Sequence, residues 1–345
     1  MRDVIDCMDP AAWDVEVVCP EGGQLWQGLV GRPSLRLRPV PAGSGLRPAD
    51  AVAWLSLLRL VRRADIVHAH SSKAGFLVRS AALLTGRTRR TAFTPHGWSF
   101  LGFSGWKRRL LIAAERLAAH WCRTIVAVSD AERVAGFTLR IGRPEQYRQV
   151  LNGIDLSRFD RLRTTGGEHE RVLVISRLSP PKRPELALSA FAVLHQTRPS
   201  ARLIVAGEGP QRAELETTLT TTGLGPAVEL MGHVDDVVPE LERASCLLLT
   251  SSYEACPLAV LEAFAAGVPV IATRTPGTAT LVEDGVTGML VGDDPGEIAA
   301  AVARALSRGA EVDQLIERAQ TMVHQRFSRQ RMTSELLAVY DQMRS

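Results

Sequence analysis

Short apolar runs alternate with longer amphipathic segments along almost the whole chain of 345 residues. In the first half, apolar runs typical of strands occupy residues 14–20, 64–70, 90–97, 124–130 and 149–153. Segments 49–63, 75–86 and 107–121 carry apolar residues at spacings of three and four, as amphipathic helices do. This βα alternation predicts parallel sheets whose two faces are covered by helices.

The alternation restarts after a polar segment. Residues 155–170 (DLSRFDRLRTTGGEHE) are rich in charge and contain a glycine pair, which indicates a linker. Strand-like runs then occupy 171–176, 201–207, 227–232, 246–252 and 268–273, and helical segments occupy 185–196, 212–219, 257–266 and 297–307. The second half therefore repeats the doubly wound α/β pattern of the first.

Four parts of the chain follow from this pattern. We expect an N-terminal domain at 1–155, a linker at 156–170, a C-terminal domain at 171–325, and a C-terminal helix at 326–345 that packs back toward the N-terminal domain. Ligands of doubly wound sheets bind beyond the carboxyl ends of the strands. The site is therefore predicted in a cleft that the two domains face.

Basic residues are concentrated in the first half. Residues 1–155 contain 22 Lys and Arg against 13 Asp and Glu, whereas the remainder contains 19 against 24. This asymmetry points to an anionic partner such as a membrane surface or a phosphorylated substrate, or it reflects only the use of arginine in place of lysine. No nucleic-acid-binding motif accompanies the charge, so nucleic acid is not an expected partner.

Several functional classes are disfavoured. The five cysteines are scattered and form no CxxC pair, so neither a disulfide framework nor a zinc site is predicted. The chain has neither a signal-peptide pattern nor an apolar run of roughly 18 residues, which favours a cytoplasmic protein, including one at the inner face of the membrane. No GxGxxG follows a strand, which argues against an NAD-dependent oxidoreductase.

The stretch SSYEACPLAVLEAFAAGVPVIAT (251–273) places two glutamates in an apolar run. Pro257 suits a first helical position and Gly267 the position after the last, which predicts a helix over 257–266. Glu262 borders its apolar face, where a carboxylate needs donors from sugar hydroxyls or from structural backbone amides. Glu254 precedes the helix, in a loop at a strand end, either as a ligand-binding residue or as a solvated acid.

Phosphate-binding groups accompany these glutamates. The amides of Cys256, Leu258 and the following residue open the helix, whose positive dipole end suits a phosphate. In SRLSPPKRPE, Arg177 and Lys182 lie at and just beyond another strand end, where a bidentate guanidinium and a point charge suit a diphosphate. Each alone would be an ordinary surface cation. Together with the helix N-terminus and the two glutamates, they predict a site for a phosphate-linked polyol.

Longer sequence motifs occur in both halves of the chain. In the second half they are IVAGEGPQRAELE, GHVDDV, the pair Glu254 and Glu262, and GVPVIATRTPGTATLVEDGVTGMLV. In the first half they are VHAHSSKAG, FTPHGWSF, VAVSDAE and QVLNGID. Taken together they resemble the retaining glycosyltransferases of family 4, which have the GT-B fold of two tandem Rossmann-like α/β domains facing a cleft.

The resemblance implies roles for individual residues. Arg177 and Lys182 would stabilise the diphosphate leaving group, Glu254 would hold sugar hydroxyls, and His96 would reach the donor sugar, although a lone histidine there is also compatible with a core role. These four are the expected catalytic residues. The expected donor-binding residues are Gly207, Gly209, Val234, Cys256, Pro257, Leu258 and Glu262, the last of them on the ribose.

Two features of the basic domain concern the acceptor and the membrane. Ser72 and Lys73 follow a strand, and Lys73 either meets an acceptor phosphate or is a solvated lysine. Segment 107–121 joins a basic start to an amphipathic helix, which either contacts anionic lipid or only packs on its sheet.

The resemblance implies a UDP-, GDP- or ADP-sugar donor, no cofactor and no metal, and a glycan or polyprenyl-linked acceptor, as in polysaccharide assembly. The chain departs from the family at its start, because the first strand and its glycine-rich loop are missing before 14–20. We interpret this as a late start or as a trimmed, inactive member. The alternatives are therefore an epimerase or hydrolase of nucleotide sugars, and a noncatalytic nucleotide-sugar binder.

Overall fold

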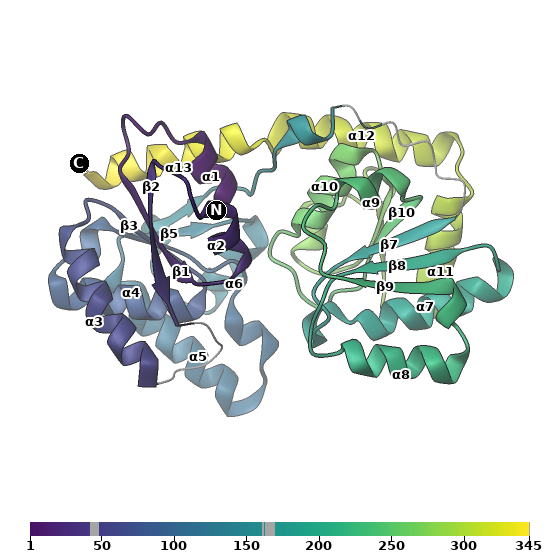
Figure 1. Cartoon of the computed structure of the whole chain (residues 1–345), viewed down its shortest axis with the longest axis horizontal. Coiled ribbons are helices and arrows are strands. Elements are labelled where there is room, and N and C mark those ends of the chain that lie inside the picture. Colours follow the sequence, from purple (N-terminus) through teal and green to yellow (C-terminus); the bar gives the residue numbers. More distant parts are fainter. Residues whose placement is uncertain (42–47, 161, 163–169, 345) are drawn as a thin grey trace. The chain divides into compact units, whose positions relative to one another are not determined.

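The computed structural model describes residues 1–41, 48–160, 162 and 170–344. The chain forms two compact units, which are coloured along the sequence in Figure 1. Unit 1 contains Met1–Gly153 and Arg329–Ser345, and unit 2 contains Ile154–Ser328. Of the linker predicted at 156–170, residues 161 and 163–169 lie outside the described residues.

Unit 2 is built on one continuous parallel sheet of six strands, in the order β12-β11-β10-β7-β8-β9. The strands are β7 (Arg171–Ile175), β8 (Arg202–Ala206), β9 (Val228–Gly232), β10 (Cys246–Leu249), β11 (Val270–Thr273) and β12 (Met289–Val291). Every residue of β10 and β11 is buried, which explains why their sequences are continuously apolar. Strand β12 lies outside the runs predicted as strands, because it has only three residues.

Helices cover both faces of this sheet (Figure 1). On one face lie α7 (Pro184–Thr197), α8 (Arg212–Thr222) and α11 (Pro295–Leu306), and on the other lie α9 (Val238–Arg243), α10 (Leu258–Ala266) and α12 (Ala310–Arg326). Phe191 and Ile298 from the helices join Val174 and Val205 from the strands in one buried cluster. Unit 2 is thus the Rossmann-like α/β domain that the alternation predicted.

Unit 1 divides its strands between two parallel sheets. One sheet pairs β1 (Val15–Pro20) with β2 (Leu35–Val40), and the other has the order β3-β4-β5-β6. The second sheet consists of β3 (Val67–His70), β4 (Thr91–Thr94), β5 (Thr124–Ala127) and β6 (Tyr147–Gln149). Within the described residues no hydrogen-bonded ladder joins β1 to β3.

Shared helices hold the two sheets of unit 1 together. Val18 of β1 and Val67 of β3 both pack on a buried cluster that includes Leu57 of α3 (Pro48–Arg63) and Ala81 of α4 (Ser72–Thr85). The remaining helices of this unit are α1 (Arg2–Cys7), α2 (Gln24–Leu29), α5 (Gly105–Ala118), α6 (Asp130–Thr138) and α13 (Arg329–Arg344). Side-chain packing, rather than main-chain pairing, therefore positions β1 and β2.

Alternation along the strands of the second sheet separates its two faces. Phe93 of β4 and Ile125 of β5 pack with α5, whereas their neighbours Ala92 and Val126 pack in the cluster formed by α1 and α13. The C-terminal helix α13 therefore contributes core residues to unit 1. No helix in the described ranges is both long and apolar enough to cross a membrane.

Two strands of unit 1 differ from the prediction. Strand β6 is Tyr147–Gln149 rather than 149–153, since only the amide of Val150 continues the pairing, to the carbonyl of Ala127. Strand β2 was not predicted because arginines alternate with its leucines. In the structure, Arg36 and Arg38 form ion pairs with Asp14, just before the partner strand β1, and with Glu16, within it. The sequence of β2 alone does not reveal these partners.

Candidate active site

The central strands of unit 2 carry the predicted donor-site residues at their carboxyl ends. Lys182 lies in the loop after β7, and Glu254 lies in the loop after β10. These strands are neighbours in the sheet although they are far apart in sequence, and the strand order reverses between them. Such a reversal is the point at which open α/β sheets bind ligands.

Lys182 and Glu254 form a close pair. Lys182 Nζ lies 2.6 Å from Glu254 Oε1, and Ser251 Oγ donates to the same oxygen at 2.6 Å. Glu254 is buried, with 7% of its surface exposed, so the alternative of a solvated loop acid is wrong. The buried carboxylate is instead held by a cation and a hydroxyl, as a buried charge requires.

Arg183, which was not among the predicted site residues, anchors the loop that carries Lys182. Its backbone has a positive φ of 48°, and its Nε donates to the carbonyl of Thr250 at 2.8 Å. Its Nη2 pairs with Asp293, beyond β12, at 2.7 Å. The guanidinium therefore ties the loop after β7 to the ends of two other strands and so fixes where Lys182 lies.

The loop after β11 packs directly against Glu254. A Cβ at Gly277 would lie 2.0 Å from the carbonyl oxygen of Glu254, so only glycine permits this approach. Thr278 Oγ1 stabilises the same loop by donating to the carbonyl of Thr273 at 2.7 Å. The threonines of RTPGTAT were the sequence signal for this anchor, but they were not predicted to be part of the site.

Gly207 and Gly209 follow β8 and lie against the loop after β7. A Cβ at Gly207 would lie 1.8 Å from the carbonyl oxygen of Ser176, and one at Gly209 would lie 2.1 Å from that of Leu178. Arg177 lies between Ser176 and Leu178 in the loop after β7, and it is exposed. The glycines thus allow the two loops to touch, with Arg177 open to solvent at the carboxyl edge of the sheet.

The N-terminus of α10 lies close to Glu254 in sequence. The helix is Leu258–Ala266, with Pro257 as its N-cap at φ −68° and ψ 114°, so the prediction that Pro257 is the first helical residue is wrong by one position. An extended ψ there keeps Pro257 outside the helix. No side chain caps this fully described helix end, and uncapped first-turn amides are groups that can bind an anion.

The other predicted donor-binding residues differ in burial. Cys256 is buried, as is Pro257, whereas Glu262 on α10 is half-buried. Val234 is half-buried in the loop between β9 and α9, at the edge of the sheet where β9 is the last strand. Val234 is therefore separated from β10 by β7 and β8 in the strand order.

A histidine pair lies at the carboxyl edge of the second sheet of unit 1. His70 ends β3, and His96 follows β4, its neighbour. His70 Nδ1 lies 2.8 Å from His96 Nε2, and the two rings are stacked with centroids 5.1 Å apart. His96 has a positive φ of 53° and is exposed, so the alternative of a core histidine is wrong.

His68, on the same strand as His70, extends this network inward. Its Nδ1 lies 2.6 Å from the hydroxyl of Tyr340 in α13, and its Nε2 lies 2.8 Å from Thr94 Oγ1. Burial lowers the pKa of both His68 and His70, so both rings are neutral at neutral pH. Burial also lowers the pKa of His96 to about 4, so one of the two contacting nitrogens donates and the other accepts, which couples the tautomer of His96 to that of His70.

Glu132 in α6 supports the loop that carries His96. Its Oε1 accepts from the amide of Gly97 at 2.5 Å, and its Oε2 accepts from the amide of Val128 at 2.9 Å. Trp98 Nε1 donates to the carbonyl of the same glutamate at 2.9 Å. Burial raises the pKa of Glu132 to about 7, and the two amides oppose that shift.

The acceptor-side prediction concerned Ser72 and Lys73 at the start of α4. Lys73 Nζ lies 2.9 Å from Asp50 Oδ1 in the first turn of α3, and Asp50 is buried. Lys73 is thus neither a solvated lysine nor an unpaired cation. An acceptor phosphate would have to compete with the Asp50 carboxylate for it.

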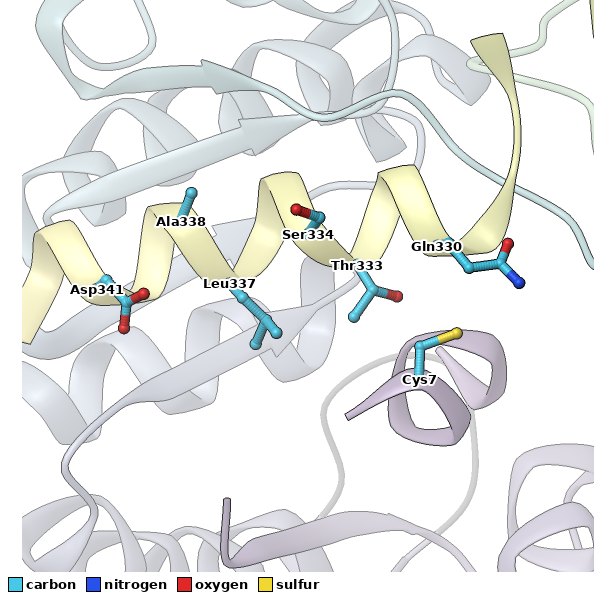
Figure 2. Close-up of a pocket in the computed structure, with 7 residues that line it drawn as sticks. All are labelled: Cys7, Gln330, Thr333, Ser334, Leu337, Ala338 and Asp341. Carbon is cyan, nitrogen blue, oxygen red and sulfur yellow. The ribbon is translucent and has the colours of Figure 1, made fainter. Parts of the chain in front are cut away.

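A separate pocket lies between α1 and α13 (Figure 2). It is lined by Cys7, Gln330, Thr333, Ser334, Leu337, Ala338 and Asp341. The buried Oγ1 of Thr333 has no hydrogen-bond partner. No predicted site residue lines this pocket, so it does not form part of the candidate active site.

Comparison with known proteins identifies the family. The protein-family model described as Glycosyltransferase Family 4 matches residues 1–158. The family model described as Glycosyl transferases group 1 matches residues 161–322. A D-inositol 3-phosphate glycosyltransferase from Saccharomonospora viridis is 30% identical over an alignment that covers 89% of this chain and 80% of that protein. The chain belongs to glycosyltransferase family 4.

Further relatives agree with this assignment. A UDP-Gal:alpha-D-GlcNAc-diphosphoundecaprenol alpha-1,3-galactosyltransferase from Escherichia coli is 26% identical over 81% of this chain and 76% of its own length. The crystal structure of Anabaena Alr3699/HepE in complex with UDP-glucose has a TM-score of 0.82 at 22% identity and covers 98% of this chain and 95% of that chain. The predicted GT-B fold and glycosyltransferase activity of this family 4 member are thus confirmed.

Proposed function

We propose that this glycosyltransferase moves a sugar from a nucleotide diphosphate sugar to a glycan or polyprenyl-linked acceptor, with retention of the anomeric configuration. The observation that carries the proposal is the meeting of Lys182 and Glu254 at the point where the strand order of unit 2 reverses. The names of relatives support this donor class, since one uses UDP-Gal and another was crystallised with UDP-glucose.

Leaving-group stabilisation is the chemistry that this edge supplies. Departure of the diphosphate builds negative charge, which Lys182, the exposed Arg177 and the uncapped amides of α10 would neutralise. When the diphosphate takes over Lys182, the Glu254 carboxylate becomes free to accept hydrogen bonds from sugar hydroxyls. Glu262 would bind the ribose, and Val234 would lie beside the base.

Retention is proposed to follow from attack on the face from which the diphosphate leaves, with a leaving-group oxygen accepting the proton of the acceptor hydroxyl. Such a reaction requires no metal and no cofactor. His96 is proposed to act on the donor sugar, with the orientation of its ring set by His70. Ser72 and Lys73 are proposed to lie on the acceptor side, where Asp50 limits the access of Lys73 to phosphate.

The location of the acceptor leads to a proposal about the membrane. A polyprenyl-linked acceptor lies in the bilayer, so we propose that the enzyme works in the cytoplasm at the inner face of the membrane, in polysaccharide assembly. The basic excess of residues 1–155 supports contact through unit 1.

A donor screen tests the proposal. The protein is incubated with UDP-, GDP- and ADP-sugars, and nucleotide release is measured with and without glycan and polyprenyl acceptors. We expect one donor class to bind, and Lys182→Ala and Glu254→Gln to weaken its binding or turnover by about tenfold or more. The exposed Glu229 of β9 provides the control Glu229→Gln, which is expected to behave as the unmodified chain does.

Four outcomes would overturn the proposal. Binding of none of the nucleotide sugars would remove the donor class. Conversion of the donor to an epimer or to free sugar without any acceptor effect would favour an epimerase or hydrolase, and binding without turnover would favour a noncatalytic binder. An inverted anomeric configuration in the product, read by NMR, would exclude retention.

A further inference from the structure

Helix α5 of unit 1 exposes an apolar stripe. Trp106, Leu110 and Leu117 are 70%, 61% and 55% exposed. Their spacings of four and seven residues bring them to one side of an α-helix. Phe103, which precedes the helix, is 50% exposed. Large apolar side chains gathered on one open helix face mark an interaction surface.

Basic side chains border this stripe. By their positions around the helix, Lys107 lies on one side of the stripe, and Arg109 and Arg116 lie on the other. The one acidic residue of α5, Glu115, is only 5% exposed, and its carboxylate lies 2.7 Å from Nη2 of the buried Arg79. The outward side of this fully described helix is therefore apolar and cationic, and it carries no carboxylate.

The inward side of α5 is packed, so the stripe is not the result of a helix placed the wrong way round. Ile112 is 7% exposed and belongs to the cluster that contains Phe93 and Ile125 of the sheet. Leu111 packs against the same cluster. The packing of segment 107–121 on the sheet is therefore confirmed for one side of the helix, and contact of its exposed side with lipid stays a prediction.

We propose that the α5 face, defined as Phe103, Trp106, Leu110 and Leu117 with Lys107, Arg109 and Arg116, docks on an anionic phospholipid bilayer. The apolar side chains would enter the headgroup and acyl boundary, and the basic ones would contact lipid phosphates. A second copy of the chain fits this face poorly, because it would bring two cationic rims together. The inference rests on the membrane location proposed above, but not on the donor chemistry of unit 2.

Vesicle sedimentation of the full chain tests this assignment. Vesicles of phosphatidylcholine alone are compared with vesicles that also contain phosphatidylglycerol, at low and high salt. We expect binding to the anionic vesicles, weakened by salt, and a loss of about tenfold or more in Leu110→Ser, because one buried leucine is removed from the interface. The double variant K107E and R109E is expected to lose binding to a similar extent.

A matched control lies on another helix of the same unit. Leu55 of α3 is 59% exposed, close to the value for Leu110, so Leu55→Ser removes an equally exposed leucine outside the α5 face. We expect it to bind vesicles as the unmodified chain does. Thermal unfolding of all variants checks that surface substitutions leave the fold intact.

The outcomes separate this inference from the proposed function. Equal vesicle binding by Leu110→Ser and the unmodified chain would overturn it, as would equal binding to neutral and anionic vesicles. A vesicle-free dimer that Leu110→Ser dissociates would assign the face to a second copy. Donor binding, measured without vesicles, is expected to be the same in every variant, so its absence in the unmodified chain would count against the proposed function alone.

Discussion

Unit 1 divides its parallel strands between two sheets, whereas unit 2 joins all six of its strands in one. In unit 2 the ladder from β10 to β7 directly fixes the loops that carry Glu254 and Lys182. In unit 1 the ladder from β3 to β4 does the same for His70 and His96, but β1 and β2 are hydrogen-bonded only to each other in the described residues. Both groups of candidate site residues thus lie at or beyond the ends of strands that are hydrogen-bonded to each other. The break between the two sheets of unit 1 does not involve the strands that carry them.

Hydrogen exchange of the two units provides the largest expected contrast. The amides of β1 and β2 should exchange about 1,000-fold faster than those of β7 and β8, because an isolated two-stranded sheet opens locally while the core strands need global unfolding. The measurement is native-state exchange followed by mass spectrometry. Equal protection of both sets would contradict local opening of β1 and β2 and would mean that they open only when their unit unfolds.

Substitution of Gly277 tests how rigidly unit 2 holds its site. Gly277→Ala places a Cβ 2.0 Å from the carbonyl oxygen of Glu254, so the loop must move and donor affinity should fall about hundredfold. Gly225→Ala is the control, since a Cβ there meets no atom within 4 Å. Calorimetry with the donor that binds the unmodified chain measures the effect, and unchanged affinity in Gly277→Ala would show that this packing does not shape the site.

Glu132 makes the stability of unit 1 depend on pH. Its pKa is raised from 4.5 to about 7 in the folded state, so folding binds a proton between these values. The stabilising contribution is complete below pH 4.5 and is lost as pH rises through about 7, with a total of roughly 3 kcal/mol. Urea unfolding across this range measures the change.

The variant Glu132→Gln should remove this part of the pH dependence, whatever its absolute stability. The exposed Glu145 provides the control Glu145→Gln, which should keep the slope of the unmodified chain. A slope that survives in Glu132→Gln would assign the proton to another group.

His70 offers the smallest expected effect. His70→Asn removes the imidazole that lies 2.8 Å from His96 Nε2, so the rate of glycosyl transfer should fall about tenfold through a misplaced His96 ring. Donor binding by unit 2 should stay unchanged. His120, exposed in unit 1, provides the control His120→Asn, and a transfer rate in His70→Asn equal to that of the control would remove His70 from the site.

The sequence predicted the strands of unit 2 more completely than those of unit 1. Buried parallel strands such as β10 and β11 are continuous apolar runs, which are recognisable without knowing their partners. Strand β2 is recognisable only beside β1, because Arg36 and Arg38 are compensated there by Asp14 and Glu16. Local patterns thus predict buried apolar strands and miss a strand such as β2, whose charges are compensated only across the pairing.

For the candidate site, the sequence indicated residue types and strand ends but not contacts. It singled out Lys182, Glu254 and His96, yet Ser251, Arg183 and His70, which hold them, were not predicted. Each of these supporting residues acts across a strand pairing or through a loop conformation. The spacing of residues along the chain shows neither the strand pairing nor the loop conformation.

The sequence by itself determined that this protein consists of two βα-repeated domains and that its candidate phosphate-binding and carboxylate residues follow strands, because periodicity and strand ends are local properties. The tertiary structure alone decided that β7 lies next to β10, that Lys182 pairs with a buried Glu254, and that His70 contacts His96. It also decided that unit 1 contains two sheets. The physical reason is that strand order and burial arise from packing between distant segments, which no single segment encodes.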